Sequence, residues 1–219
     1  IIGVVAAMTM PTLMNQTNGA QYKAAYKKAL SAISQGITLN VALDGGSFAD
    51  AVAGDAGSKE QKNGSDTVAS ILNSRMNIVK VATAADSGYG MTGEGNNATS
   101  NFPGKVKTCK ETKDDGSCQT YESVSPDTFL FFNDGVTFAY KSADAKGCTD
   151  DSVKGVNHCV GVIDVNGTKG PNKVTECDSA NATEANCTVT NPKDIYPVEF
   201  YDQTVLPASP AAKAVLYGK

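Results

Sequence analysis

Residues 1–14 form an uncharged, mostly apolar run that continues directly into an amphipathic helical pattern. The run contains Gly3, which lowers helical preference, and Pro11, which removes a hydrogen bond inside a helix and kinks or loosens the backbone. It is too short to cross a bilayer by itself, because a spanning helix needs about 20 apolar residues. The sequence therefore predicts an apolar half-helix, an amphipathic half-helix and a globular body.

The amphipathic half follows from position 15, where apolar side chains recur every three or four residues and lysines lie mostly on the other side. This spacing predicts one stripe along a helix. The helix should run from the start of the chain to about Leu43 and end at Gly45-Gly46, because glycine readily terminates helices. The stripe needs a partner surface to be buried, and it consists of Tyr22, Ala25, Tyr26, Ala29, Leu30, Ile33 and Ile37.

A second, shorter helix is predicted at about 66–80, with Ser65 as its N-cap and Asp66 in its first turn. The segments 44–64 and 84–108 are rich in glycine and small polar residues and are interpreted as loops. The apolar residues that share one face of this helix are Val68, Ile71, Leu72, Met76 and Val79.

The periodicity changes after Ser125 to one that is typical of strands. Two aromatic segments, 128–132 and 136–140, flank Asn133-Asp134-Gly135, which predicts a β-hairpin. Further strands are predicted at 159–165 and 197–201. We therefore expect an α+β fold, in which a long N-terminal helix (1–43, apolar over 1–14 and amphipathic over 15–43) packs on the antiparallel sheet of a head formed by residues 44–219.

The cysteines indicate a disulfide-stapled head. The chain has six cysteines and no Cys-x-x-Cys motif, which favours disulfides and an oxidising compartment outside the cytoplasm. Several pairings are open, and the one we favour is sequential, so that each bond closes a local loop and contributes roughly 2–4 kcal/mol. The expected bonds, in loops around the sheet, are Cys109–Cys118, Cys148–Cys159 and Cys177–Cys187.

The opening residues Ile1-Ile2-Gly3-Val4-Val5-Ala6-Ala7-Met8-Thr9-Met10-Pro11 resemble the N-terminal segment of type IV pilins and pseudopilins, where an IIGVLAAIAIP-type run ends the membrane helix. The likeness is tight over residues 1–14 and looser to about residue 43, and the rest shares only the general organisation. It implies a pilin-like head and a bacterial structural protein. It also implies that about ten family positions precede Ile1. In the family these positions include the processing site, the methylated first residue and an acidic residue used in subunit registration. None of these roles is therefore assigned to a residue of this sequence.

The resemblance implies that the chain acts by assembly. The subunit would first reside in the bacterial inner membrane. Inner-membrane assembly machinery would then add it to a helical filament made of copies of itself, at the cell surface or in the periplasm. Gly3 and Pro11 would mark where the helix melts or kinks. The apolar halves would pack together in the filament core, through Ile1, Ile2, Val4, Val5, Met8, Met10, Leu13 and Met14.

Other classes of function find little support in the sequence. The formal net charge of −4 and the single arginine, Arg75, argue against a nucleic-acid partner. Gly88–Gly93 matches G-x-G-x-x-G, but a poor helix start follows it, which argues against a nucleotide site. We find no nucleophile–base pair, metal cluster or phosphate loop, so we do not expect an enzyme, and His158 is interpreted as an exposed loop histidine.

Two alternatives stay open. A calcium site outside the EF-hand pattern could use Asp164 and Asn166, because some pseudopilins carry a calcium loop near the C-terminus; otherwise no cofactor is expected. The other alternative is a membrane-tethered binding or adhesion module that does not polymerise, for which residues 1–14 would be only an anchor. The two hypotheses are distinguished by self-association through residues 1–14, which a pilin shows and the tethered module does not.

Overall fold

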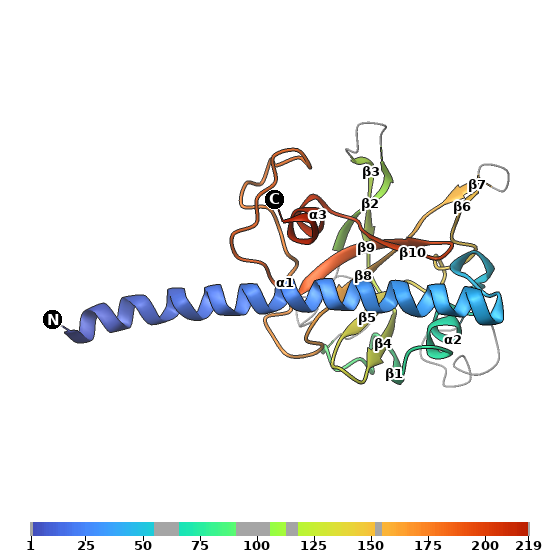
Figure 1. Cartoon of the computed structure of the whole chain (residues 1–219), viewed down its shortest axis with the longest axis horizontal. Coiled ribbons are helices and arrows are strands. Elements are labelled where there is room, and N and C mark those ends of the chain that lie inside the picture. Colours follow the sequence, from blue (N-terminus) through green and yellow to red (C-terminus); the bar gives the residue numbers. More distant parts are fainter. Residues whose placement is uncertain (1, 55–65, 91–105, 113–117, 152–154, 219) are drawn as a thin grey trace.

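Helix α1 (Ile2–Asp44) runs the length of the molecule, and its N-terminal part extends beyond the body (Figure 1). The structure, a computed structural model, describes residues 2–54, 66–90, 106–112, 118–151 and 155–218; for 2–17, 108–112, 118–121, 151 and 155 it describes the backbone alone. At about 1.5 Å per residue, the 43 residues of α1 span roughly 65 Å. The helix continues through Pro11 and ends where predicted, because Gly45 takes a left-handed φ of 76°.

The body is built on one six-stranded sheet in which all neighbouring strands are antiparallel. The predicted hairpin is confirmed as β4 (Thr128–Phe132) and β5 (Thr137–Tyr140), and Gly135 in its turn has a φ of 88°. The predicted third and fourth strands are confirmed as β8 (Cys159–Asp164) and β9 (Ile195–Tyr201), with bounds shifted by one or two residues. In spatial order the strands are β1 (Ile78–Thr83), β4 (Thr128–Phe132), β5 (Thr137–Tyr140), β8 (Cys159–Asp164), β9 (Ile195–Tyr201) and β10 (Thr204–Pro207).

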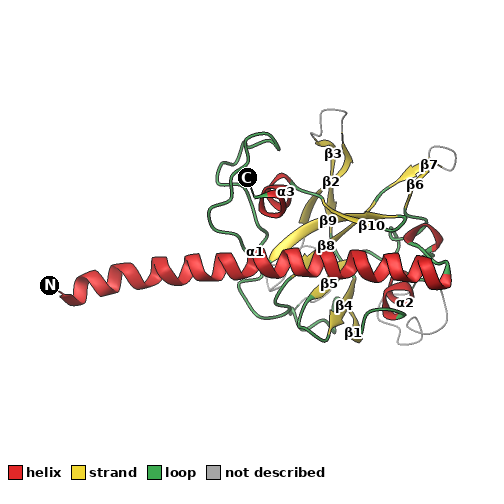
Figure 2. Cartoon of the chain, in the orientation of Figure 1, coloured by secondary structure: helices red, strands yellow, loops and turns green. Residues whose placement is uncertain are grey.

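The predicted apolar stripe of α1 packs on one face of this sheet. Tyr26, Ile33 and Ile37 are fully buried there, in one cluster with Phe138 and Phe200 of the sheet. The other face is covered by the hairpin of β2 (Val106–Thr112) and β3 (Cys118–Val124), since β2 lies against β8 and β9. Figure 2 shows α1 crossing in front of the strands of the sheet. The expected α+β class, with a long N-terminal helix and an antiparallel sheet, is confirmed.

The prediction of a helix at 66–80 is wrong in its second half. Helix α2 covers only Val68–Asn73, and its N-cap is Thr67, whose hydroxyl accepts a hydrogen bond from the Ser70 N–H. The chain then turns and enters β1, where it pairs with β4. The run Ile78-Val79-Lys80-Val81 is β-branched apart from the lysine, and such residues favour strands when a neighbouring strand is available.

Several small elements were not predicted. The 84–108 segment was interpreted as a loop, but β2 begins at Val106; positions 91–105 lie outside the described residues. Helix α3 (Pro210–Tyr217) is capped by Ser209 and ends at Gly218, whose φ is 76°. The remaining elements are η1 (Phe48–Asp50), β6 (Thr149–Asp151) and β7 (Gly155–Asn157).

Two of the three predicted disulfides are confirmed. The Cys148–Cys159 and Cys177–Cys187 bonds have S–S lengths of 2.02 and 2.03 Å. Cys109 and Cys118 belong to the paired strands β2 and β3, but their side chains lie outside the described part of the chain. The expectation that the cysteines lie in loops is wrong for these two and for Cys159, which begins β8.

Candidate functional site

The two halves of α1 have different surroundings. The backbone of residues 2–14, which includes most of the expected assembly residues together with Gly3 and Pro11, belongs to the N-terminal part of α1 (Figure 1). Their side chains, and Ile1 altogether, lie outside the described part of the structure. From about residue 22 onward α1 is held on the body, against β8, β10, α2 and α3.

Two close contacts anchor the amphipathic half on the body. The rings of Tyr26 on α1 and Tyr196 on β9 stack with their centroids 3.9 Å apart and an interplanar angle of 8°. Further along, Gly36 allows Met76 to approach the helix, because a Cβ at position 36 would lie 2.9 Å from the Met76 Cγ. Aromatic stacking and close packing of this kind fix the position of a helix on a sheet.

Hydrogen bonds fix the C-terminal end of α1. The buried Asn40 side chain donates to the Gly46 carbonyl at 2.6 Å and accepts from the Ser74 hydroxyl at 2.5 Å. An ion pair of 2.7 Å joins Asp44 to Arg75. The end of α1 is therefore tied both to the turn that follows it and to the residues after α2.

The face of α1 that points away from the sheet is exposed along the body. It is mostly small or polar, but Leu39 and Leu43 leave 53% and 68% of their surface in solvent. These two are one helical turn apart, so they form a continuous apolar patch. The exposed residues, spaced three or four positions apart, are Ala20, Ala24, Lys27, Ser31, Gln35, Leu39 and Leu43.

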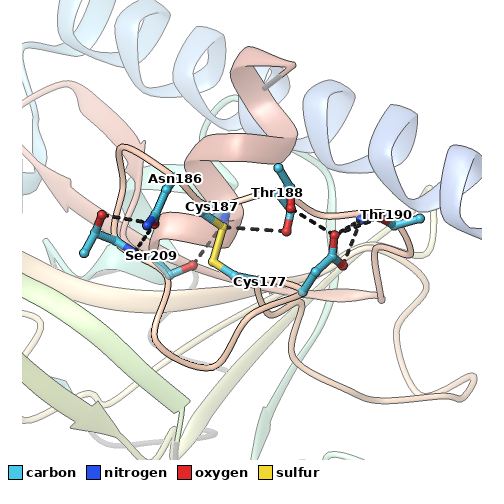
Figure 3. Close-up of a disulfide and its surroundings, with 9 residues drawn as sticks. Cys177, Asn186, Cys187, Thr188, Thr190 and Ser209 are labelled. Atoms are coloured by element: carbon cyan, nitrogen blue, oxygen red, sulfur yellow. Dashed lines mark hydrogen bonds between the residues drawn. A yellow bond between two sulfur atoms is a disulfide. The ribbon is translucent and has the colours of Figure 1, made fainter.

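The C-terminal loop is braced by its disulfide. Asp178 accepts hydrogen bonds from Thr188 and from the backbone and hydroxyl of Thr190, which lower the pKa of its carboxyl (Figure 3). Cys187 packs with Ala211 and Ala214 of α3. An open cleft of about 580 Å³ lies between this loop and the start of α3. Its lining includes Val174, Glu176, Asp178, Ala182, Pro197 and Ser209.

The two candidate calcium ligands lie together, at the end of β8 and two residues beyond it. Asp164 is buried, and its two oxygens accept from the Tyr89 hydroxyl at 2.8 Å and the Asn166 N–H at 3.1 Å. Burial raises the pKa of the Asp164 carboxyl to about 7. The Asn166 amide donates to the Gly170 carbonyl. Among the residues that the structure describes, no group of three or more His, Cys, Asp or Glu side chains could hold a metal.

His158 lies in the connection between β7 and β8, as the interpretation as a loop histidine has it, but the expectation that it is exposed is wrong. Its side chain is 17% exposed and lies between Asp150 and Glu199, beside the ring of Tyr201. Glu199 is nearly buried, and burial raises the pKa of its carboxyl, while the charges of His158 and Lys213 oppose that shift. Sequence reasoning missed this cluster because β6 and β9 come together only in the folded chain.

Comparison with protein-family models, curated proteins and solved structures returned no match. Within the described ranges, no helix is both long enough and apolar enough to cross a membrane.

Proposed function

We propose that this chain is a structural subunit of a type IV pilin or pseudopilin filament, which polymerises through its N-terminal helix. The observation that carries the proposal is the division of α1 into two parts. One end is packed firmly on the sheet, and the other continues as helix beyond the body (Figure 1). An apolar run at the end of a helix that extends beyond the body is stabilised when it packs against other apolar surfaces.

The packing of the other half supports the same proposal. Tyr26, Ile33 and Ile37 bind α1 to the sheet, so a head must move together with its helix. In a bundle of such helices the heads would surround the apolar segments. The exposed α1 face that contains Leu39 and Leu43 would then be available to contact neighbouring subunits. Burial of each apolar side chain in the bundle contributes roughly 1.5–3 kcal/mol.

The two disulfides support a location outside the cytoplasm. Cys148–Cys159 and Cys177–Cys187 require an oxidising compartment to form and persist. We infer that the head is displayed in the periplasm or at the cell surface, after the subunit has left the inner membrane for the filament. The pilin-like identity of the head rests on the order of its elements, a long helix followed by an antiparallel sheet and a disulfide-closed C-terminal loop.

A second candidate function is a membrane-tethered binding module that does not polymerise. The open cleft beside the Cys177–Cys187 bond favours it, because its mixture of apolar and polar lining residues suits a small ligand or a peptide. In this case residues 1–14 would anchor the head, and no self-association would occur through them.

Electron microscopy of filaments sheared from native cells, followed by mass spectrometry of their protein, tests the proposal. Filaments in which this chain is the main component would establish the structural role. If filaments are absent, or hold this chain only in traces, the polymer proposal fails for a major subunit. Chemical cross-linking in intact cells then separates the tethered module, which stays monomeric, from a minor subunit, which cross-links to other filament proteins.

A further inference from the structure

The cleft beside the Cys177–Cys187 bond has a volume of about 580 Å³ and is built from separate parts of the chain. One wall is the segment 174–180 of the C-terminal loop, and the other is the start of α3 at 209–211. Figure 3 shows Ser209 close to the disulfide. The lining is completed by Lys107 of β2, Ala182 and Pro197 of β9.

Hydrogen bonds hold the first wall in place. Thr175 is buried; its N–H donates to the Ile195 carbonyl at 2.8 Å, and its hydroxyl donates to the Lys193 carbonyl at 3.0 Å. Further along, the Asp178 carboxylate accepts from the Thr190 N–H at 3.1 Å and from the Thr190 hydroxyl at 2.8 Å. A wall that is fixed in advance loses little conformational entropy when a ligand binds.

The same wall has an open backbone edge. The Ile195 N–H donates to the Lys173 carbonyl, and the Thr175 N–H donates to the Ile195 carbonyl, as in a parallel strand pair. The backbone groups of Val174 and Glu176, which alternate with these, therefore point away from β9. Within the described part of the chain they have no hydrogen-bond partner. Such an edge can accept another extended chain as an added strand.

The side chains that line the cleft suit a peptide better than a flat ring. Most of them are small, so the main chain of a ligand can approach closely. None of the lining residues is aromatic, whereas nucleobases bind chiefly by stacking on aromatic side chains. The small lining residues are Ser179, Ala180, Ala182, Ser209 and Ala211.

The charges of the first wall favour a cationic group on the ligand. Glu176 and Asp178 are both exposed and both line the cleft, and they are two positions apart on the extended segment. The hydrogen bonds from Thr188 and Thr190 lower the pKa of the Asp178 carboxyl, so this group stays ionised. Lys107 is the one basic side chain among the lining residues. The lining is therefore acidic overall, which complements a lysine or arginine of a ligand.

We propose that this cleft binds an extended peptide segment of a partner protein, which adds as a strand along Val174 and Glu176 and places a basic side chain beside Glu176 and Asp178. The neighbouring side chains of the peptide pack on Pro197 and on the small residues of the lining. This inference concerns the head alone and holds whether or not the chain polymerises, so filament formation and peptide binding can each fail without the other.

Nuclear magnetic resonance titration of the isotope-labelled full-length chain in a mild detergent tests the proposal. The probe is the peptide acetyl-Val-Lys-Val-Ala-amide, in which β-branched residues that favour strands flank a lysine. We expect saturable shifts of the Val174 and Glu176 amide signals. The matched peptide with glutamate in place of lysine should bind at least about two- to fivefold more weakly, as the loss of an exposed ion pair predicts.

Two further peptides test the mode of binding. Each carries N-methyl groups on alternate amides of the probe, one on the odd and one on the even positions. In an added strand, only one set of alternate N–H groups faces the protein. One methylated peptide should therefore bind on the order of tenfold more weakly than the probe, because donors that the edge requires are lost, while the other should bind nearly as well.

Variants of the protein locate the site. Glu176→Gln, at an exposed position, should weaken binding of the lysine probe about two- to fivefold. Ala180→Trp, also exposed, should abolish binding because the larger side chain occupies the cleft. The matched control is Asp66→Asn, which removes one negative charge at an exposed residue outside the lining and should leave binding unchanged.

Wild-type protein whose Val174 and Glu176 signals do not shift with the lysine probe would overturn the proposal, and this result does not depend on whether a variant folds. Equal binding of the two methylated peptides would exclude strand addition. Equal effects of Glu176→Gln and Asp66→Asn would show that the probe responds to net charge and not to this cleft.

Discussion

Tyr26 and Tyr196 stack face to face, with a centroid distance of 3.9 Å, near the N-terminal end of the packed part of α1. Both residues are fully buried, and the Tyr26 hydroxyl has no hydrogen-bond partner among the described residues. The pair therefore combines extensive apolar burial with an unsatisfied hydroxyl on Tyr26, and burial raises the pKa of both hydroxyls. The rings, more than the hydroxyls, hold the helix in place.

The first prediction separates the ring of Tyr26 from its hydroxyl. Tyr26→Ala should lower the free energy of unfolding by about 3–5 kcal/mol, because it opens a large cavity beside Tyr196. Tyr26→Phe keeps the ring and removes a buried, unpaired hydroxyl, so we expect it to be neutral or stabilising by about 1 kcal/mol. Urea denaturation followed by circular dichroism would measure both. A Tyr26→Phe variant as unstable as Tyr26→Ala would show that the hydroxyl is the important group.

The second prediction concerns Asp164. Its folded pKa of about 7 lies above the ordinary value, so from about pH 4 to 7 the folded state holds a proton that the unfolded state has lost. Stability should therefore fall as pH rises through this window and then level off, with a total effect on the order of 2–4 kcal/mol. Asp164→Asn keeps an oxygen for the Tyr89 hydroxyl and removes the titration.

Denaturation midpoints at several pH values would compare Asp164→Asn with the wild type. The variant should gain stability relative to the wild type as pH rises towards 7, with Asp66→Asn, at an exposed aspartate, as the control for net charge. A wild-type minus variant difference that does not change with pH would contradict the assignment of this titration to Asp164.

The third prediction concerns the Cys177–Cys187 bond, which closes a short loop of the C-terminal segment. The double variant Cys177→Ser/Cys187→Ser should lose roughly 2–4 kcal/mol of stability, because the bond restricts the unfolded chain. Cys187 is also buried against α3, so the loss should include local loosening of that helix. Thermal melts of the wild type with and without reductant should show a change in the same direction, because reductant also breaks this bond. A melting temperature that is equal for the double variant and the oxidised wild type would contradict this.

The fourth prediction tests the apolar half of α1. Val5→Lys or Met8→Lys should abolish filaments, because a lysine in the bundled core is left without water or a counter-charge. The head should still fold with its disulfides formed. The matched control is Val79→Lys, since Val79 is 63% exposed on the edge strand β1 and lysine is well tolerated on edges. Normal filament yield from Val5→Lys would count against core packing.

Local signals made much of the fold predictable. The amphipathic stripe, the Asp-Gly turn at 134–135 and the terminating Gly45 each act within a few residues, and the structure confirms α1 and the β4–β5 hairpin. Helix α3 also had a local signal, Ser209 before Pro210 with Gly218 at the end, which could have been found. The second half of the predicted 66–80 helix failed because pairing with β4 outweighs helical periodicity in a β-branched run.

Long-range relationships could not be predicted. The pairing of Tyr89 with Asp164, and of His158 with Glu199, joins residues from distant parts of the chain, and nothing in their neighbouring residues specifies the partner. For the apolar half of α1, the pattern identifies which residues are apolar but not what they pack against. The expected roles of Val5, Met8 and Pro11 in a filament therefore stay predictions.

The order of the chain also constrains how it can fold during synthesis. Helix α1 is made first, yet its buried stripe packs on β8, β9 and β10 and beside α3, which are made last. A nascent chain must therefore carry the uncovered side chains of Tyr26, Ile33 and Ile37 until almost all residues have emerged. Contacts between such distant segments slow folding. Loss of the C-terminal strands by truncation or early termination would remove part of the surface on which α1 packs and turn the product into an aggregation-prone fragment.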